Sequence, residues 1–220
     1  EKEVLSVMLS QFNKVYTDKL RDRQKELKMT IEQVVNIASI VEKEAVLDED
    51  RPIIASVFYN RLKIGMPLQS DATIQYIFKE RKKIVTYKDL EIDSPYNSYK
   101  NKGLPPTPIA SPGIKSIEAT LYPEKTEYLY FVAKMDGGNN YSTNYEDHLK
   151  YVKEYKDERD RLNAEVERLS KELFSENNTV KYNILQAHNY IINKSKYDSK
   201  KISGESIYNS DKATGALFEG

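Results

Sequence analysis

Apolar residues recur at helical spacing through much of the chain, and residues 30–45 show this pattern most clearly. Ile37, Val41 and Ala45 fall on one stripe when residues are placed at about 100° intervals. Thr30 and Gln33, which precede them, form a T-x-x-Q capping box, a pattern typical of a helix N-terminus. The segment is therefore predicted to be a helix that starts after Thr30 and buries one face.

Two acidic residues near the end of this helix occupy different sides of it. Glu44 follows Val41 by three positions and lies close to the apolar stripe, whereas Glu42 falls about 90° from the centre of the stripe. Apolar surroundings disfavour an ionised carboxylate and raise its pKa, as a general acid requires at neutral pH. Glu44 is therefore a candidate general acid. A surface glutamate paired with Lys43 or Arg51 is the plainer interpretation.

Further helices are expected on both sides of this one. The pattern indicates a first helix over residues 3–27. A third helix is expected to carry Pro52 in its first turn and to end near Gly65. Asn60 and Arg61 stand beside its apolar face, and the plainest interpretation makes them a helix-end polar group and a surface charge.

Short polar and amide side chains cluster in the segment that follows. Ser70 is suited to cap a short helix reaching residue 78. Gln69, Asp71 and Thr73 are suited to binding hydroxyl groups. Capping alone would account for Ser70 and Asp71 but would leave Gln69 unexplained.

Residues 93–113 form a long stretch rich in proline and glycine. Five of these 21 residues are proline and two are glycine, which excludes a helix or a central strand. A loop of this length is either disordered or functional. Tyr96, Tyr99, Leu104 and Ile109 give it apolar anchors and argue against disorder. We expect an ordered loop that forms one wall of a binding groove, with Glu44 lining the other side.

The C-terminal part begins with a helix at Ser111 and Pro112 and continues with the best strand of the chain, residues 128–133. A Gly-Gly turn then leads to a partner strand near Tyr141, and residues 142–155 return to helix.

Beyond about residue 156 the chain changes character. Leucine and valine follow 4-3-4 spacing among charged residues, which fits a short coiled coil or an amphipathic helix that docks on the domain. One helix is expected over 157–174, and residues 176–220 carry no chemical motif. The predicted fold is therefore α+β: a mostly helical domain over 1–155 with a small antiparallel β-sheet and the Pro/Gly-rich groove loop, followed by a helical tail over 156–220.

Composition narrows the chemistry. The 220 residues carry 34 basic and 34 acidic side chains, so bulk electrostatics disfavour nucleic acids and anionic membranes as partners. The chain has no cysteine and two histidines, which excludes thiolate chemistry and disfavours a Ser-His-Asp triad or a multi-histidine metal site. An enzyme of this composition would work with carboxylates. Seventeen tyrosines and no tryptophan suit a carbohydrate site, although tyrosine also serves as core filler.

Several short motifs in a fixed order carry a family resemblance. They are 38-ASIVEKE-44, 57-VFYNRL-62, 68-LQSD-71, 94-SPYNSY-99, 103-GLPPTPI-109 and 128-YLYFV-132. This series resembles the YceG/MltG family of endolytic murein transglycosylases over about residues 1–155.

The resemblance implies a membrane-anchored enzyme at the extracytoplasmic face of the bacterial cell membrane. Such an enzyme cuts nascent peptidoglycan glycan strands and limits their length, without a cofactor, and cell-wall synthesis enzymes are candidate partners. It also implies an N-terminal anchor and a small LysM-like subdomain that are not in this chain, so that contact with the membrane is expected through that anchor.

Carried onto this sequence, the resemblance makes Glu44 the catalytic glutamate, in agreement with the helical-face argument. The residues that match the family's glycan groove are Gln69, Asp71, Tyr96, Asn97 and Tyr99, and Asn60 is a further substrate-binding candidate. The family usually has a histidine after the Gly-Gly turn, where this chain has Asn139. A role for that histidine cannot be transferred.

The implied chemistry needs one carboxylate. A glycoside hydrolase commonly uses two, whereas a lytic transglycosylase uses the C6 hydroxyl of the substrate's own N-acetylmuramic acid as the nucleophile and makes a 1,6-anhydro product. One glutamate can act first as acid and then as base, and the intramolecular attack gains from proximity. Asn97, Gln69 and the substrate's acetamido group are candidates to stabilise the oxocarbenium-like charge.

Two other classes of function compete with this hypothesis. A catalytically weak peptidoglycan-binding module would be favoured by an exposed, ion-paired Glu44. A pyridoxal-phosphate lyase would need a lysine Schiff base and a phosphate cup, and no Gly-rich cup precedes a helix in this sequence.

Overall fold

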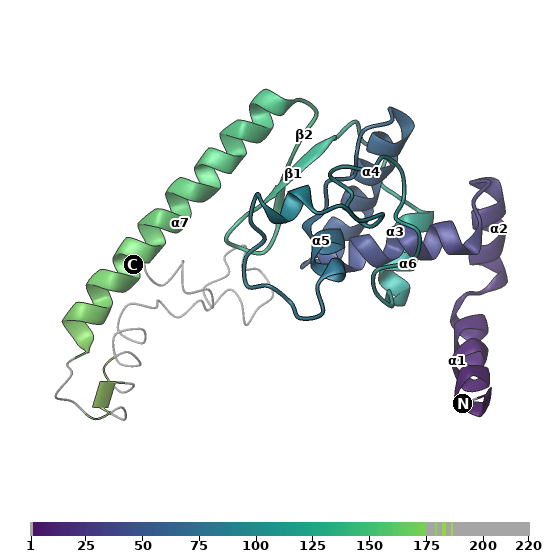
Figure 1. The fold of residues 1–220 in the computed structure, drawn as a ribbon, viewed down its shortest axis with the longest axis horizontal. Helices are drawn as coiled ribbons and strands as arrows, with labels where there is room; N and C mark the ends of the chain where they lie inside the picture. Colours follow the sequence, from purple (N-terminus) through teal and green to yellow (C-terminus); the bar gives the residue numbers. More distant parts are fainter. Residues whose placement is uncertain (1, 175–178, 180–181, 184–185, 187–220) are drawn as a thin grey trace, which may run out of the picture. The chain divides into compact units, whose positions relative to one another are not determined.

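The computed structural model describes residues 2–174 together with residues 179, 182, 183 and 186 (Figure 1). The described chain divides into two compact units. The first contains residues 2–132 and 137–148, and the second contains residues 133–136 and the described residues from 149 onward. All of the predicted site residues lie in the first unit. Among the described residues, no helix has the length and apolarity needed to cross a membrane.

The predicted α+β fold, mostly helical with a small antiparallel sheet, is confirmed. The elements in chain order are α1 (Lys2–Val15), α2 (Asp18–Glu26), α3 (Ile31–Glu44), α4 (Arg51–Lys63), α5 (Asp71–Ile77), α6 (Ile114–Leu121), β1 (Tyr130–Ala133), β2 (Asn139–Ser142) and α7 (Tyr145–Leu173), with short 3-10 turns η1 (Asp48–Asp50) and η2 (Asp89–Glu91).

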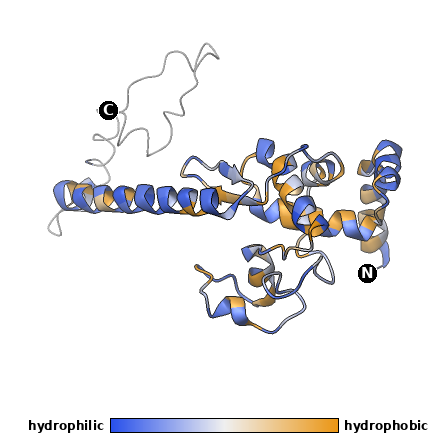
Figure 2. Cartoon of the chain, turned by 90° about the horizontal axis from the view of Figure 1, so that it is seen from above, coloured by the Kyte–Doolittle hydropathy of each residue, from blue (hydrophilic) through white to orange (hydrophobic). Residues whose placement is uncertain are grey.

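Helix α3 forms the centre of the first unit. It packs against α4, α5 and α6, and its residues 36–41 are all buried. Figure 2 shows hydrophobic residues gathered on these central helices, whereas α7 is hydrophilic along most of its length. The predicted apolar stripe is therefore correct but too narrow, because neighbours also cover Asn36, Ser39 and Ile40 on the other sides of α3. Such a buried helix holds its last residue, Glu44, firmly in place.

The predicted ends of the central helices are confirmed. The Thr30 side chain accepts a hydrogen bond from Gln33 N at 3.2 Å, and the Gln33 side chain accepts one from Thr30 N at 2.9 Å. Pro52 lies in the first turn of α4. Gly65 follows α4 with a φ of +67°, a conformation that glycine adopts without steric cost.

The first predicted helix, over residues 3–27, is wrong in one respect, because the chain forms two helices there. Thr17 is extended and occupies the N-cap of α2. The bend brings Tyr16 and Leu20 into one core cluster with Val34 and Leu121. Burying both of these residues accounts for the break, since α1 by itself contains no buried residue.

The 93–113 loop contains no helix or strand, as predicted, and it is held by specific hydrogen bonds. Asn36 donates to the carbonyl of Pro105 at 2.6 Å, and Ile109 N donates to the hydroxyl of Ser39 at 3.0 Å. These two polar residues of α3 therefore satisfy backbone groups that the loop cannot pair within itself. The prediction of a fixed loop is confirmed, and its role as a groove wall stays a prediction.

The C-terminal elements begin and end close to their predicted positions. Strand β1 starts at Tyr130 rather than at residue 128, although Leu129 N still bonds to the carbonyl of Ser142 at 2.9 Å. Helix α6 begins after Gly113. Helix α7 is continuous through residues 155 and 156, so the two helices predicted over 142–155 and 157–174 are one. Self-association of this helix stays a prediction, and most of the segment 176–220 lies outside the described residues.

Candidate active site

Glu44 is the last residue of α3, and its carboxylate meets the start of α5. The hydroxyl of Ser70 donates a hydrogen bond to Glu44 Oε1, and the backbone N–H of Ala72 donates a second bond to the carboxylate. The side chain is partly buried. The tight packing of α3 and the first turn of α5 together position this carboxylate.

The surroundings of Glu44 raise its pKa above the ordinary value for glutamate. Burial is the main cause, and the negative charge of Asp71 adds to it. The hydrogen bonds from Ser70 and Ala72, together with the positive charge of Arg61, oppose this rise without cancelling it. The direction of this pKa shift agrees with what a general acid needs, and the catalytic use of Glu44 stays a proposal.

The plainer interpretation of Glu44, an ion pair with Lys43 or Arg51, does not hold. Arg51 instead bonds to Glu42 Oε2 at 3.2 Å and to Asp48 at 3.0 Å. Glu42 also accepts hydrogen bonds from the hydroxyl of Ser116 at 2.6 Å and from Gly113 N at 3.2 Å. Glu42 therefore belongs to an ion pair with Arg51, and its contacts join α3 to α4 and α6.

A chain of buried hydroxyl groups supports Ser70. Ser70 N donates to the hydroxyl of Ser98 at 3.0 Å, and the Ser98 and Thr73 hydroxyls lie 2.8 Å apart. Ser70, Thr73 and Ser98 are all at most 3% exposed. Sequence reasoning predicted Ser70 as a capping residue. It does occupy the N-cap position of α5, but its side chain makes no cap hydrogen bond because it is turned toward Glu44.

Asp71 and Tyr99 form a second polar pair at the site. The Tyr99 hydroxyl donates to Asp71 Oδ1 at 2.5 Å, and burial together with this carboxylate raises the pKa of Tyr99. The charges of Asp71 and Glu44 interact, as do those of Glu44 and Tyr99. The structure therefore brings two of the predicted glycan-binding residues, one of them from the 93–113 loop, into the surroundings of Glu44.

Gln69 adopts a backbone conformation that is uncommon for a residue with a side chain. Its φ is +49°, and its N–H donates to the carbonyl of Ser98 at 3.0 Å. Its side chain is exposed, directly before the residue that contacts Glu44. Strained backbone of this kind clusters at functional sites, which agrees with the prediction that Gln69 binds substrate.

Asn97 does not fit the prediction of direct glycan binding. It is 0% exposed, and its amide donates to the carbonyls of Leu90 and Ile92 at 2.8 Å each. Its side-chain oxygen accepts from Tyr99 N at 3.0 Å. All of these contacts are internal, because the turn around Asn97 leaves backbone groups that need partners. Asn97 is therefore corrected to a residue that positions Tyr99.

Asn60 and Arg61 make internal contacts as well. Both amide hydrogens of Asn60 are taken up by the carbonyls of Thr126 and Tyr128, at 2.9 Å each, so that a glycan could meet only its oxygen. Arg61 is 6% exposed and donates to the carbonyls of Leu68 and Leu129 at 2.6 Å each. The interpretation of Arg61 as a surface charge is wrong. Arg61 follows Phe58 by three residues, so helical spacing puts it near the apolar face, and this spacing could have indicated its burial.

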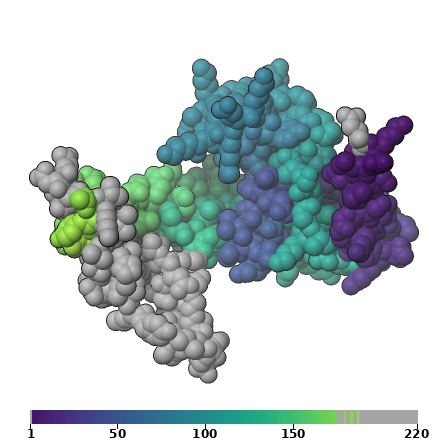
Figure 3. Space-filling model, turned by 90° about the horizontal axis from the view of Figure 1, so that it is seen from below, coloured from purple at the N-terminus to yellow at the C-terminus, as the bar shows by residue number. Residues whose placement is uncertain are grey.

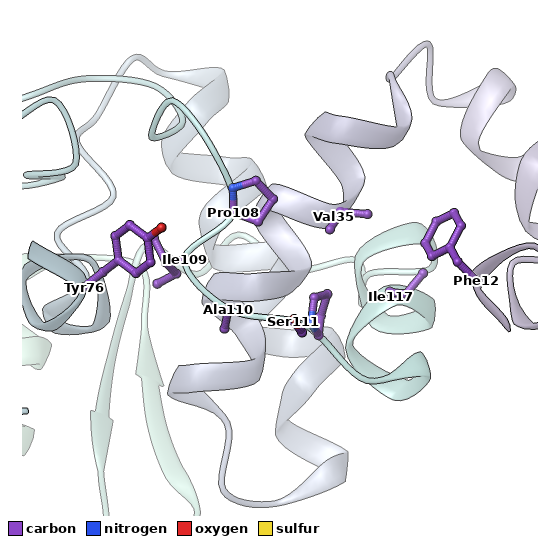
Figure 4. Close-up of a pocket in the computed structure, with 9 residues that line it drawn as sticks. Phe12, Val35, Tyr76, Pro108, Ile109, Ala110, Ser111 and Ile117 are labelled. Atoms are coloured by element: carbon purple, nitrogen blue, oxygen red, sulfur yellow. The ribbon is translucent and has the colours of Figure 1, made fainter. Parts of the chain in front are cut away.

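Tyr96, near the same end of the loop as Tyr99, packs against α5. Its ring lies 4.9 Å from that of Tyr76, and its hydroxyl is 2.7 Å from that of Thr107. A hollow of about 540 Å³ lies nearby, lined by Phe12, Val35, Tyr76, Ile117 and residues 108–112 (Figure 4). Glu44 and Tyr96 are not among these lining residues. A groove that joins Glu44 to Tyr96 stays a prediction.

Asn139, at the position where the family resemblance implies a histidine, binds an acidic residue. Its amide donates to Asp50 at 3.0 Å, and the Tyr141 hydroxyl donates to the same carboxylate at 2.6 Å. Asp50 is buried, so these two bonds offset the loss of its hydration. Among the described residues, no group of three or more acidic or histidine side chains could hold a metal ion.

The fold and the site define an α+β domain that holds the partly buried carboxyl group of Glu44 among hydroxyl and amide groups. The chain belongs to the YceG-like family, whose model matches residues 1–154.

Three related proteins show how far the similarity extends. An endolytic murein transglycosylase of Bacillus subtilis is 46% identical over 153 residues, which is 70% of this chain and 42% of the relative. An endolytic murein transglycosylase of Streptococcus pneumoniae is 44% identical over 133 residues, which is 58% of this chain and 24% of the relative. The crystal structure of a YceG-like protein from Listeria monocytogenes has a TM-score of 0.57 at 51% identity, over 60% of this chain and 43% of that one. The chain thus spans less than half the length of each.

Proposed function

We propose that this chain is the catalytic part of an endolytic peptidoglycan lytic transglycosylase. It would cleave the bond between N-acetylmuramic acid and N-acetylglucosamine in nascent glycan strands and leave 1,6-anhydro ends. The observation that carries the proposal is the carboxylate of Glu44, whose pKa is raised by burial and by Asp71 while Ser70 and Ala72 hold it in place. The names of the relatives from Bacillus and Streptococcus support the same reaction.

Glu44 would act twice in one turnover. In its protonated form it donates a proton to the glycosidic oxygen as the bond breaks. As a carboxylate it then removes the proton from the C6 hydroxyl of the same N-acetylmuramic acid, whose oxygen attacks C1 and closes the anhydro ring. A group that is protonated before reaction and readily ionised after it suits both steps, and the hydrogen bond from Ser70 favours the ionised form that the second step requires.

Other residues of the site would bind and stabilise the strand. Gln69 projects an exposed amide beside Ser70, and the Asp71–Tyr99 pair offers a carboxylate and a phenol to sugar hydroxyls. Tyr96 and the oxygen of Asn60 are further binding candidates. We assign the stabilisation of developing positive charge to Gln69 and to the substrate's acetamido group. Asn97 would act through the position of Tyr99.

The proposed substrate also fixes where this site works. Peptidoglycan lies outside the bacterial cell membrane, so the site would face the extracytoplasmic side, close to the enzymes that synthesise nascent strands. Those enzymes are candidate partners. No step of the proposed reaction calls for a cofactor.

Product analysis on purified glycan strands tests the proposal. Cleavage should yield ends lighter by one water than a reducing sugar, detected by mass spectrometry. Reducing ends alone would indicate a hydrolase and would overturn the anhydro mechanism. Binding without cleavage would indicate a peptidoglycan-binding module instead. The hydrogen bond from Ser70 to Glu44, in place of an exposed ion pair, argues against such a module.

A further inference from the structure

A short segment between α5 and η2 concentrates positive charge in a chain that is neutral overall. Residues 79–88 contain five basic side chains and one acidic side chain, a net charge of +4, whereas the whole chain has a net charge of zero. Lys79, Arg81, Lys83 and Lys88 are exposed. In the part of the chain that the structure describes, none of these four side chains forms an ion pair, so their charges face solvent. We call residues 79–88 the basic loop.

The same loop exposes two large apolar side chains. Ile84 is 71% exposed and Tyr87 is 88% exposed. Single exposed apolar residues are common on protein surfaces, but these two lie between the lysines at 83 and 88. The basic loop belongs to the blue-to-teal part of the chain, which projects from the rest of the first unit in Figure 3.

Hydrogen bonds fix the two ends of the basic loop. The Gln75 side chain both donates to and accepts from the backbone of Lys82, at 2.9 Å each. Asp89, only 6% exposed, accepts hydrogen bonds from Lys82 Nζ at 2.5 Å, from Thr86 N at 2.8 Å and from the Thr86 hydroxyl at 2.7 Å. Lys82 also covers the ring of Phe78, 4.1 Å from its centroid. These contacts hold the ends of the segment 83–88 together, so that Ile84 and Tyr87 are presented outward rather than folded back.

We propose that the basic loop is a membrane-contact site that binds the surface of an anionic phospholipid bilayer. The four free cationic side chains would lie among the lipid headgroups, and Ile84 and Tyr87 would enter the interface. The zero net charge disfavours an anionic bilayer as a partner only for the chain taken as a whole, and not for the basic loop. At the Debye length of physiological salt, about 8 Å, a local cluster acts largely independently of distant acidic residues.

The two exposed apolar side chains, Ile84 and Tyr87, favour a bilayer over other polyanions as the partner. A soluble anionic polymer without rings would be bound through the lysines and arginine alone. A single-stranded nucleic acid would also stack its bases on Tyr87, but it would leave Ile84 exposed to water. A bilayer interface accommodates both parts of the loop, because tyrosine is enriched at the headgroup level and isoleucine gains by leaving water.

The proposal is independent of the proposed reaction. A loop that contacts the membrane would work in the same way on a protein that binds glycan without cutting it. Glu44→Gln should therefore bind vesicles as the unsubstituted chain does, and failure of either proposal leaves the other open to its own test.

The absence of tryptophan from the chain allows a direct test. Tyr87→Trp would place a single tryptophan at the tip of the basic loop, and Tyr122→Trp would place one at a position after α6 that is 42% exposed. With vesicles of phosphatidylglycerol and phosphatidylcholine, emission from position 87 should shift to the blue and become shielded from an aqueous quencher. Emission from position 122 should not change. No shift at 87, or an equal shift at both positions, would overturn the proposal.

Vesicle flotation with matched variants separates charge from insertion. Lys83→Gln with Lys88→Gln should weaken binding about 30-fold, since each lysine near an anionic surface contributes about 1 kcal/mol. Lys153→Gln with Lys156→Gln, two exposed lysines of α7, should leave binding unchanged. Ile84→Ser with Tyr87→Ser should weaken binding by a similar factor while all charges remain. Vesicle binding that depends on the lysines but survives the serine pair would be purely electrostatic and would refute insertion of Ile84 and Tyr87 into a bilayer.

Discussion

Ser70 donates its hydroxyl hydrogen to the carboxylate of Glu44 across 26 positions of sequence. Glu44 ends α3, and Ser70 stands at the N-cap of α5, so this bond joins two helices at the proposed acid. A hydroxyl that donates to a carboxylate favours its ionised form, while burial favours the neutral form. The balance between the hydrogen bond and burial sets the protonation of Glu44.

Glu44→Gln should abolish glycan cleavage and leave glycan binding largely intact. Glutamine has nearly the same volume and can still accept the bond from Ser70, but it cannot donate a proton as an acid. General acid–base catalysis contributes roughly 10²–10⁴-fold, so the residual rate should be close to the detection limit. Strand-cleavage assays and binding to insoluble peptidoglycan measure the two properties separately.

Glu42→Gln is the matched control for that experiment. It changes a neighbouring carboxylate that is bound by Arg51, Ser116 and Gly113 N instead of facing Ser70. Removing its charge should lower stability while the folded protein keeps most of its activity. If Glu42→Gln is inactive while Glu44→Gln keeps nearly full activity, Glu42 is the acid instead.

Ser70→Ala should raise the pKa of Glu44, because it removes a hydrogen bond that stabilises the carboxylate. If protonated Glu44 starts the reaction, kcat/KM declines as pH rises through this pKa. The alkaline limb of the pH profile should therefore move to higher pH, and the rate of the step that needs ionised Glu44 should fall. Ser111→Ala, at an exposed serine, should move nothing. If kcat/KM falls by the same factor at every pH and the alkaline limb does not move, Ser70 has only a packing role.

Asp71→Asn should move the same limb in the opposite direction. The negative charge of Asp71 raises the pKa of Glu44, so neutralising it should lower that pKa and bring the alkaline limb to lower pH. Asparagine can still accept the hydrogen bond from Tyr99, so that the geometry of the pair is largely kept. The pH dependence of kcat/KM is again the measurement. Movement in the same direction as Ser70→Ala would show that Asp71 does not act on Glu44 through its charge.

Much of the fold followed from local signals. The capping box at Thr30, the proline in α4 and the glycine after it each act through backbone groups within a few residues, so their effects are readable in the sequence. The position of Glu44 at the edge of the apolar stripe was likewise readable, because helical periodicity fixes which face a residue occupies.

The features that sequence reasoning missed depend on contacts between distant segments. The break between α1 and α2 serves a core that Tyr16 shares with residues of α3 and α6. Arg61 is buried because the carbonyls of Leu68 and Leu129 converge on it. Asn97 is a different case. The family resemblance implies a glycan ligand there, but its amide is taken up by the carbonyls of Leu90 and Ile92, which are 7 and 5 residues away. The direction of the Ser70 hydroxyl could be known only once α5 was placed against the end of α3.

Gln69→Gly should stabilise the fold and weaken glycan cleavage at the same time. Glycine adopts the φ of +49° without steric cost, so relief of strain should offset the greater freedom of its unfolded state and leave about 0.5–1 kcal/mol of gain. Gln69→Ala loses the same amide but keeps the strain, and should be no more stable than the unsubstituted chain. Chemical denaturation of both variants measures the difference. Equal stabilities would show that this backbone conformation carries no strain.

Glu44→Gln should also stabilise the protein, and by an amount that depends on pH. Because the pKa of Glu44 is higher in the folded state than in the unfolded state, the unfolded chain gives up this proton more readily. The raised pKa therefore costs no stability below the unfolded-state value, about 4.3, and costs progressively more as pH rises from there through the folded-state pKa. Each pH unit between the two values corresponds to about 1.4 kcal/mol. Denaturant unfolding should give similar free energies for the two proteins near pH 4 and a more stable Glu44→Gln at pH 8. A difference that shrinks as pH rises would mean that the hydrogen bonds from Ser70 and Ala72 outweigh burial, and that Glu44 is ionised too readily to serve as the acid.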